Sequence, residues 1–263
     1  MLSSIKTFSA PLFFITLFLL EYWLPQFKNR PLWEIRKFSN MSMTGINFLC
    51  GHFFALGFLF HALKLELGLF HLFQLARPLQ FLATLILFDL ALYAQHLISH
   101  KVAFLWRFHR VHHSDLFLDT TSALRFHPGE IIFSSLYKAL IGVGIGASFH
   151  DYLIFETLLT LAALFNHSNI AISAETNKFI KLFIVTPQMH RIHHSPYGNE
   201  TQHNFGFGVS WWDKIFKTYR EKTNQGPSMT FGEPKVLLKK DLSLNEMITY
   251  PFKANTVKSS KLS

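Results

Sequence analysis

The sequence predicts an all-α fold, an integral membrane bundle of helices, and three observations support this. Hydrophobic residues make up 49% of the 263 residues and charged residues only 16%, whereas soluble domains carry about 25% charged residues. The apolar residues form long runs, as membrane helices require. The 15 histidines include closely spaced groups beyond the ends of these runs, where a polar site would meet the membrane surface.

Three apolar runs, near residues 8–25, 46–65 and 79–99, are each long enough to cross a hydrocarbon core of roughly 30 Å once. The first run is not followed by a small-residue cleavage site, so we interpret it as a retained membrane segment. Basic residues between the first two runs favour the cytoplasmic side of the membrane; they are Lys28, Arg30, Arg36 and Lys37. On this topology, the residues after about 96 reach the cytoplasmic face.

A fourth apolar region, Ile131 to Phe165, is interrupted by the polar stretch 148–151, which predicts a helical hairpin. Gly142, Gly144 and Gly146 are expected to let neighbouring helices approach closely. A single bent or re-entrant segment is the alternative, and both arrangements leave the histidines before and after this region on the same side. The expected organisation is therefore N-terminal transmembrane segments at 1–78, a catalytic unit at 79–220 and a polar surface tail at 221–263 with disordered last residues.

Charge and cysteine content exclude several classes of protein. The formal net charge is +9, but the chain is too apolar for a soluble nucleic-acid binder and has no exposed basic recognition helix, so no nucleic-acid partner is expected. Cys50 is the single cysteine, so an intrachain disulfide and a cysteine metal site are both excluded.

The spacing of the histidines predicts metal binding. His96 and His100 lie four residues apart, on one face of a helix, and an H-x-x-H-H pattern occurs at 109–113 and again at 190–194. These eight imidazoles exceed the roughly six donors that one metal ion holds, so two ions are expected. His167 follows the hairpin on the same side and is a ninth candidate. The predicted ligands are His96, His100, His109, His112, His113, His167, His190, His193 and His194.

Other histidines and acidic residues have less direct predicted roles. His127 is either a ligand or a group that supports one, and His203 is expected to support a ligand or line a substrate pocket. Ordinary helix-end or core positions are expected for His52, His61, His71 and His150. Metal-binding imidazoles usually donate their second N–H to a carboxylate or carbonyl, and the candidate partners are Asp89, Asp115, Glu130, Asn166 and Asp213.

With these motifs, the sequence resembles the fatty acid hydroxylase and sterol desaturase superfamily of membrane di-metal oxidases. The resemblance covers about residues 79–220 and includes the histidine patterns at 96–100, 109–113 and 190–194, together with Asn166-His167. The stretches 204–206 (Asn-Phe-Gly) and 212–219 (Trp-Asp-Lys-Ile-Phe-Lys-Thr-Tyr) resemble the closing segment of the family. Ala163 stands where some relatives have a further histidine.

The resemblance implies two iron ions at the cytosolic membrane surface that use O₂ to hydroxylate or desaturate a lipid C–H bond. It also implies a lipid substrate from the bilayer and a separate electron donor of the reductase, ferredoxin or cytochrome type. His127-Pro128-Gly129 lacks the second glycine expected of a fused haem domain. All-nitrogen ligation would also suit zinc, so a zinc-dependent membrane lipid hydrolase or isomerase is an alternative, as is a non-enzymatic membrane metal-binding protein. The sequence identifies neither the lipid nor the choice among hydroxylation, desaturation and ether cleavage.

Overall fold

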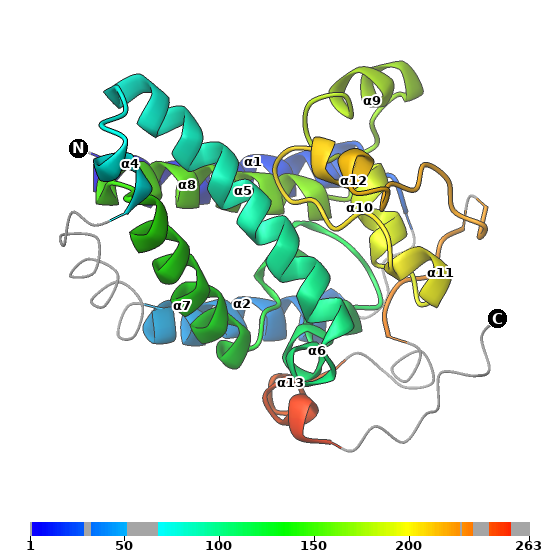
Figure 1. The fold of residues 1–263 in the computed structure, drawn as a ribbon. Helices are drawn as coiled ribbons and strands as arrows, with labels where there is room; N and C mark the ends of the chain where they lie inside the picture. The colour runs from blue at the N-terminus through cyan, green and yellow to red at the C-terminus, as the bar shows by residue number, and fades with distance from the viewer. Residues whose placement is uncertain (1, 29–32, 52–67, 227, 234–241, 254–263) are drawn as a thin grey trace.

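The structure, a computed structural model, describes residues 2–28, 33–51, 68–226, 228–233 and 242–253 (Figure 1). Within these ranges the regular elements are helices, and extended backbone pairs only at two isolated bridges, Pro25 with Ile170 and Ile184 with Val209. The predicted all-α class is therefore confirmed.

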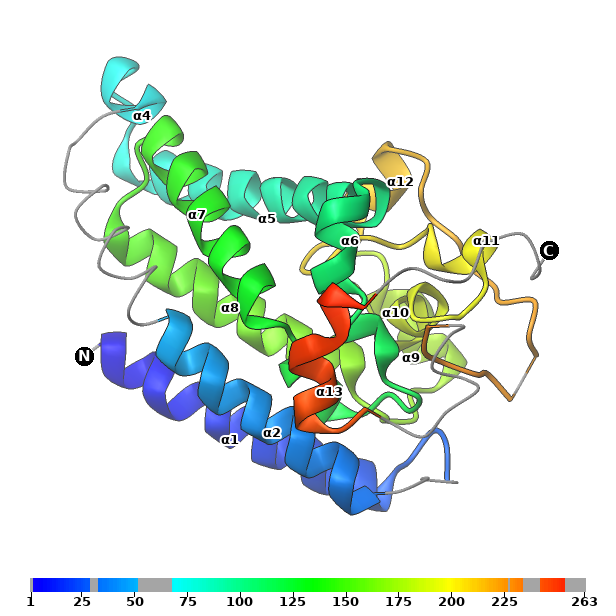
Figure 2. The same cartoon turned by 90° about the horizontal axis from the view of Figure 1, so that it is seen from below.

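Three helices form the frame of the molecule: α5 (Arg77–Lys101), α7 (Pro128–Ile145) and α8 (Phe149–His167). α5 packs on both α7 and α8. Two N-terminal helices add to this frame, α1 (Leu2–Trp23) against α8 and α2 (Trp33–Gly51) against α7. The short helix α4 (Leu69–Leu72) lies beside the start of α5 (Figure 2).

The predicted hairpin is present as α7 and α8. Gly146 ends α7 with a φ of 79°, a conformation that glycine adopts without steric cost. The Ser148 hydroxyl accepts a hydrogen bond from the backbone N–H of Asp151 and so caps α8. The two helices diverge from this turn (Figure 1). The expected helix contact is absent at Gly144, where an added Cβ would meet nothing within 4 Å.

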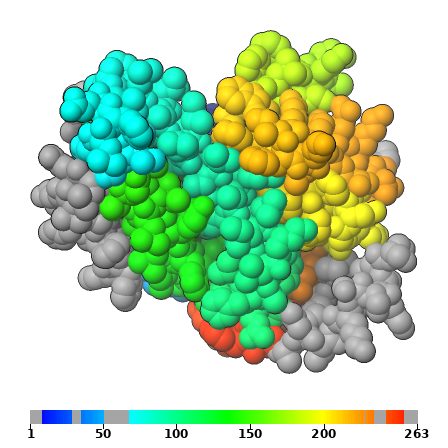
Figure 3. Space-filling view, viewed as in Figure 1, coloured from blue at the N-terminus to red at the C-terminus, as the bar shows by residue number. Residues whose placement is uncertain are grey.

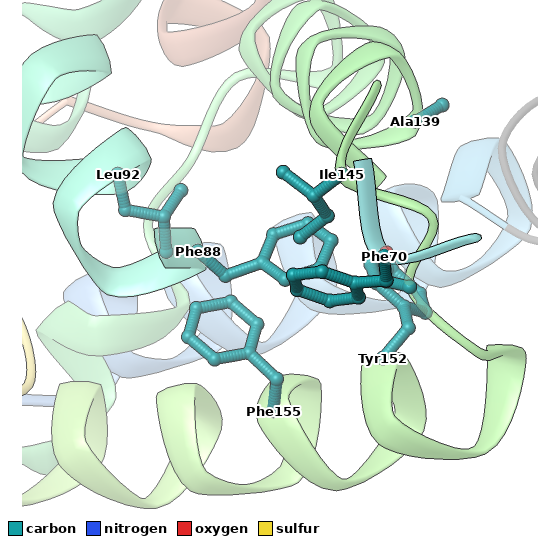
Figure 4. Close-up of a cluster of buried hydrophobic side chains, with 8 residues drawn as sticks. Phe70, Phe88, Leu92, Ala139, Ile145, Tyr152 and Phe155 are labelled. Atoms are coloured by element: carbon teal, nitrogen blue, oxygen red, sulfur yellow. The ribbon is translucent and has the colours of Figure 1, made fainter. Parts of the chain in front are cut away.

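The turn end of the frame is filled by an apolar core, shown in Figure 4. Phe88 of α5 stacks on Phe155 of α8 with ring centroids 5.0 Å apart. Phe70 and Ile145 pack into the same cluster. Burying each such side chain contributes about 1.5–3 kcal/mol, so this core holds the three helices together at the end opposite the histidines.

One helix among the described residues, α5, is long and apolar enough to cross a membrane, and α1 contains a shorter apolar stretch, Ser9–Trp23. The predicted run at 46–65 begins in the last residues of α2, and its remainder, 52–65, lies outside the described residues. A multi-pass topology therefore stays a prediction.

The expectation that Arg36 and Lys37 belong to a basic surface loop was wrong. Both are buried side chains of α2. Arg36 donates to Asp115 at 2.9 Å and to Asp119, while the Lys37 ammonium lies 3.9 Å from the centre of the Phe18 ring. Two buried carboxylates compensate the charge of Arg36, which explains how it is tolerated inside the protein.

The C-terminal segment also differs from the expected polar surface tail. Helix α13 (Leu244–Thr249) and the 3-10 turn η4 (Tyr250–Phe252) pack against α2 and α6 (Ala103–His109), at the lower edge of the view in Figure 3. Met247 and Tyr250 are buried with Met43 and Val111, and Arg110 donates to the Tyr250 carbonyl at 2.6 Å. The apolar side chains of this short stretch explain its docking, and the predicted disorder of 254–263 lies outside the described residues.

Candidate metal centre

The nine predicted ligands meet at the end of α5 and α8 that lies away from the hairpin turn. α5 contributes His96 and His100, α6 (Ala103–His109) ends on His109, and α8 ends on His167. The 3-10 turn η2 (His112–Ser114) and helix α10 (Pro187–His193), with its C-cap His194, supply the remainder. All nine are buried, and none is more than 8% exposed.

The nine side chains form two groups, and within each group the ligand atoms lie within 4.8 Å of one another. We call them the five-histidine group and the four-histidine group. The first contains His96, His100, His109, His113 and His193. The second contains His112, His167, His190 and His194.

The two H-x-x-H-H motifs are shared between the groups in a reciprocal way. The first and last histidines of the 109–113 motif belong to the five-histidine group, and the middle one, His112, belongs to the other. The 190–194 motif does the reverse, because its middle histidine, His193, joins the five-histidine group. On a helix, residue i+4 lies about 40° from residue i around the axis, and i+3 lies about 60° to the other side. The 190–194 motif, on α10 and its C-cap, therefore directs its histidines to two adjacent centres, and the 109–113 motif reaches the same division across the turn from α6 to η2.

The ring nitrogens within each group face one another at short distances. In the five-histidine group, Nε2 of His109 lies 3.1 Å from Nε2 of His96 and of His100, and 3.2 Å from that of His113. In the four-histidine group, Nε2 of His167 lies 3.0 Å from Nε2 of His112 and of His190. A metal–nitrogen bond is about 2.1 Å, so ligands at right angles are about 3.0 Å apart and tetrahedral ligands about 3.4 Å apart. The observed separations fit metal ligation with near-right angles.

Hydrogen bonds on the outer nitrogens fix which ring nitrogen is free to bind a metal. Nδ1 of His96 lies 2.7 Å from the Phe205 carbonyl, Nδ1 of His167 lies 2.7 Å from the Ala163 carbonyl, and Nδ1 of His193 lies 2.8 Å from the His203 carbonyl. A carbonyl only accepts, so each Nδ1 carries the hydrogen and each Nε2 keeps its lone pair.

His109 is fixed in the same way by a carboxylate. Its Nδ1 donates to Oε1 of Glu130 at 2.6 Å, so its Nε2 also presents a lone pair. Two lone pairs therefore face each other between His96 and His109, where no hydrogen is left to share. Nε2 of His193 is likewise buried without a hydrogen-bond partner. A cation between these atoms would remove the repulsion, so the donor set fits bound metal ions.

Burial keeps the imidazoles in the neutral form that binds metals. Loss of hydration lowers the pKa of His193 to about 3. The pKa values of His112, His113, His190 and His194 lie well below the usual value for histidine, first because of burial and second because neighbouring imidazoles repel a second positive charge. These rings are therefore uncharged at neutral pH, as ligation requires.

Of the five predicted supporting groups, Glu130 is the one that contacts a histidine, His109. The prediction was wrong for the other four as direct partners of ligands: backbone carbonyls are the partners of His96, His167 and His193. Asp213 accepts from the backbone N–H of Phe205 and Gly206 at 2.8 and 2.9 Å, and Asn166 donates to the Phe207 carbonyl. Asp115 instead pairs with Arg36.

Asp89 holds the same loop from α5. It accepts from the backbone N–H of Gly208 and Val209 and, at 2.7 Å, from Nε1 of Trp212. The predicted closing motif, 204–206, is thus the loop whose Phe205 carbonyl accepts from His96. Asp89 and Asp213 fix this loop from two sides and act on the ligand through it.

The remaining histidines lie outside both groups. His127 caps α7 by accepting from the backbone N–H of Gly129, and its Nε2 lies 3.1 Å from the Ile248 carbonyl. His203 supports His193 through its backbone carbonyl and not its ring. His71 and His150 are exposed, as expected for non-ligands, whereas His52 and His61, predicted at ordinary helix-end or core positions, lie outside the described residues.

Sequence reasoning missed the residues that surround the histidines. Phe126 stacks on the His112 ring with centroids 4.3 Å apart and an angle of 9° between the planes. Trp106 packs against His100 and His113. Both residues are aromatic, and nothing in their sequence positions distinguishes them from ordinary core residues.

A cavity of about 220 Å³ adjoins the five-histidine group between α5, α7 and α8. His96, His109 and Glu130 line it, together with mostly apolar side chains such as Leu92 and Leu159. The lining includes none of the four-histidine group. A bound molecule in this cavity would therefore approach the five-histidine group.

The fold and the site together define a helical protein with a clustered-histidine centre. Comparison with known families makes this specific: the fatty acid hydroxylase model matches residues 81–218, more than half of the chain, and the chain belongs to that family. The matched range contains all nine clustered histidines.

Curated relatives are similar to the chain over this same region. The ornithine lipid hydroxylase OlsE of Rhizobium tropici is 28% identical over 135 residues, which is 51% of this chain and 40% of that protein. Alkylglycerol monooxygenases of Caenorhabditis elegans and Homo sapiens are 24% and 27% identical, over 53% and 56% of this chain and 26% and 34% of their own lengths. The match thus spans less than half of each relative. No solved structure matches the chain significantly.

Proposed function

We propose that the protein is a membrane-bound di-iron oxygenase that hydroxylates or desaturates a lipid C–H bond, using O₂ and electrons from a separate donor. The observation that carries the proposal is the convergence of two groups of buried Nε2 lone pairs beside an apolar cavity. Family membership supports the oxidative chemistry, and the printed names of the relatives support a lipid substrate.

The five-histidine group would hold one iron ion and the four-histidine group the other. When bound, the pair would supply the activation of O₂ and the removal of hydrogen from carbon, so no separate general base is required. Family membership supports iron over zinc, and the 3.0–3.2 Å between neighbouring nitrogens suits an ion bound in each group.

The side chains around the metal site have three roles in this proposal. Glu130 and the Phe205, Ala163 and His203 carbonyls hold four imidazoles with Nε2 directed inward. Phe126 covers His112 and separates the four-histidine group from the cavity. The apolar walls of the cavity exclude water and align a lipid chain with His96 and His109.

The proposed location is the membrane, with several passes and with the histidines on the cytoplasmic side. α5 would be one crossing; its histidine end carries the exposed Lys101 and the following helix α6 carries the exposed Arg107, and both cations favour the cytoplasmic side. We propose residues 1–78 as N-terminal membrane segments and 79–220 as the catalytic unit, on which residues 242–253 dock. A reductase, ferredoxin or cytochrome is the proposed electron donor.

The proposal is tested on protein purified in detergent, by metal analysis, oxygen uptake and mass spectrometry of lipids from cells with and without the gene. We expect two irons per chain, and lipid masses that shift by one oxygen or two hydrogens. His112→Ala and His193→Ala should each abolish metal loading and turnover, whereas His150→Ala should do neither. Zinc in place of iron, with turnover that consumes no O₂, would support the hydrolase or isomerase alternative. Activity that survives loss of the metals would refute the proposal.

A further inference from the structure

An ion pair lines the cavity at a distance from the histidines. Nζ of Lys138 on α7 donates to Oε1 of Glu156 on α8 at 2.6 Å, and their side chains are only 9% and 16% exposed. Both residues line the same cavity as His96 and Glu130. Lys138 follows Glu130 by eight positions, which places the two roughly 12 Å apart along the axis of α7.

The apolar core of Figure 4 includes residues next in sequence to the ion pair. Ala139 and Phe155, the neighbours of Lys138 and Glu156 in sequence, both belong to that core. Among the lining residues of α7 and α8, Lys138 and Glu156 lie farthest along their helices from the histidine end, so the pair lies at the far end of the cavity lining.

Stability does not explain a charged pair at this place. A buried ion pair is often no more stable than apolar residues of similar volume, and ionisable residues at membrane depth mark substrate pathways. Three further polar side chains line the cavity: Gln95, Ser134 and Thr160. Ser134 donates a hydrogen bond to Gln95 at 3.2 Å. A cavity for plain hydrocarbon would need none of these groups.

We propose that Lys138 and Glu156 bind a neutral hydrogen-bonding group of the substrate, a hydroxyl or an amide, and so select which carbon lies beside His96 and His109. The ammonium offers N–H donors and the carboxylate offers acceptors, while the pair carries no net charge. An anionic group would meet Glu156 and a cationic group would meet Lys138, so a neutral group with both a donor and an acceptor fits best. The selection of a carbon rests on the proposed function, whereas binding of the polar group does not.

The test measures binding without turnover, on the purified full-length chain in detergent micelles. Tritiated 1-hexadecanol is the probe, and unlabelled 1-hexadecanol, hexadecanamide, hexadecane and hexadecanoate compete with it. For the wild-type chain we expect the alcohol and the amide to compete about tenfold better than hexadecane and better than hexadecanoate, since a hydrogen bond to a charged group is stronger than one between neutral groups.

The variant is the double substitution Lys138→Met with Glu156→Leu, because removal of both charges avoids leaving one buried without a partner. It should bind the alcohol, amide and alkane equally, with hexadecane binding unchanged. The control is Arg77→Gln with Asp151→Asn, which removes another ion pair, at 2.6 Å, between α5 and α8 that does not line the cavity. The control should keep the wild-type preference.

Three results would overturn the inference. The double variant could keep the preference for the alcohol. The wild-type chain could bind hexadecanoate best, or it could fail to bind 1-hexadecanol. Metal content and oxygen uptake are measured on the same samples. Absence of iron and of oxygen uptake would refute the proposed oxygenase while the binding result still decides the role of the ion pair.

Discussion

At the scale of single residues, the site depends on the two ring nitrogens of an imidazole having different roles. Where a partner is present, the outer nitrogen donates a hydrogen bond, and the inner nitrogen faces the other histidines. His96, His167 and His193 donate from Nδ1 to backbone carbonyls, which leaves Nε2 directed at the other members of their group. His109 differs, because its outer partner is the Glu130 carboxylate. A carboxylate makes the imidazole a stronger electron donor than a carbonyl does, so Glu130 is expected to strengthen the bond between His109 and a metal ion.

Glu130→Leu tests this difference at the residue scale. Removal of the acceptor should weaken metal retention by roughly 10- to 100-fold, the usual effect of losing a group that orients a ligand. The measurement is competition for the metal with a chelator of known affinity, followed by elemental analysis of the protein.

Glu130→Gln is the matched control for that variant. Its amide oxygen can still accept from Nδ1 of His109, so we expect a smaller loss of metal than with leucine. Equal metal retention in wild type and Glu130→Leu would show that Glu130 does not orient the ligand.

At the scale of elements, the loop at 204–209 is held from two sides and carries a contact to a ligand. Asp89 of α5 binds its backbone N–H groups at Gly208 and Val209, and Asp213 of α12 (Trp211–Ile215) binds those at Phe205 and Gly206. Burial raises the pKa of Asp213, while its hydrogen bonds favour the charged form. Close approach of a carboxylate to the backbone explains the glycines at 206 and 208, where an added Cβ would lie 2.9 Å from Oδ2 of Asp213 and 2.2 Å from Oδ1 of Asp89.

Gly208→Ala is expected to disrupt this loop. A Cβ at Gly208 would lie 2.2 Å from Oδ1 of Asp89, so the carboxylate must move away from its backbone donors. Loss of such buried hydrogen bonds costs about 1–3 kcal/mol, and displacement of the Phe205 carbonyl should also weaken metal retention. Thermal denaturation in detergent and elemental analysis measure the two effects.

The control for this substitution is Gly144→Ala in α7, where an added Cβ meets nothing within 4 Å. Alanine is the better helix former, so this variant should be as stable as the wild type or more stable. If Gly208→Ala behaves like Gly144→Ala, Asp89 does not constrain the loop.

At the scale of the whole molecule, the centre joins segments that are far apart in sequence. Its ligands come from α5, α6, η2, α8 and α10. These buried imidazoles lie at the end of the frame opposite the apolar core, and their lone pairs repel one another. Metal ions would convert this repulsion into cross-links between the helices.

Metal removal should therefore destabilise the whole fold. A chelator is expected to lower the melting temperature of the purified protein, and added iron should restore it, because binding to the native state alone stabilises it in proportion to RT ln(1 + [metal]/Kd). The melting temperature should rise with iron concentration in the wild type. It should not rise in the double variant that carries both His112→Ala and His193→Ala. A melting temperature that does not change on metal removal and reloading would contradict the proposed cross-linking.

The sequence determined much of this protein by itself. Run length and low charge predicted the helices α1, α5, α7 and α8, because a helix buries its own backbone groups and depends on local composition. The histidine spacing predicted eight members of the two groups, because residues three and four apart lie close together on a helix, and the place of His167 after the hairpin predicted the ninth.

Tertiary structure alone decided how these parts combine. It assigned the middle histidine of each motif to the opposite group and gave three of the nine outer nitrogens backbone carbonyls as partners. It buried Arg36 against Asp115 and Asp119. It also docked Met247 and Tyr250 onto the body and placed Lys138 beside Glu156. These contacts join residues distant in sequence, whose meeting depends on how whole helices pack and leaves no periodic signal in the chain.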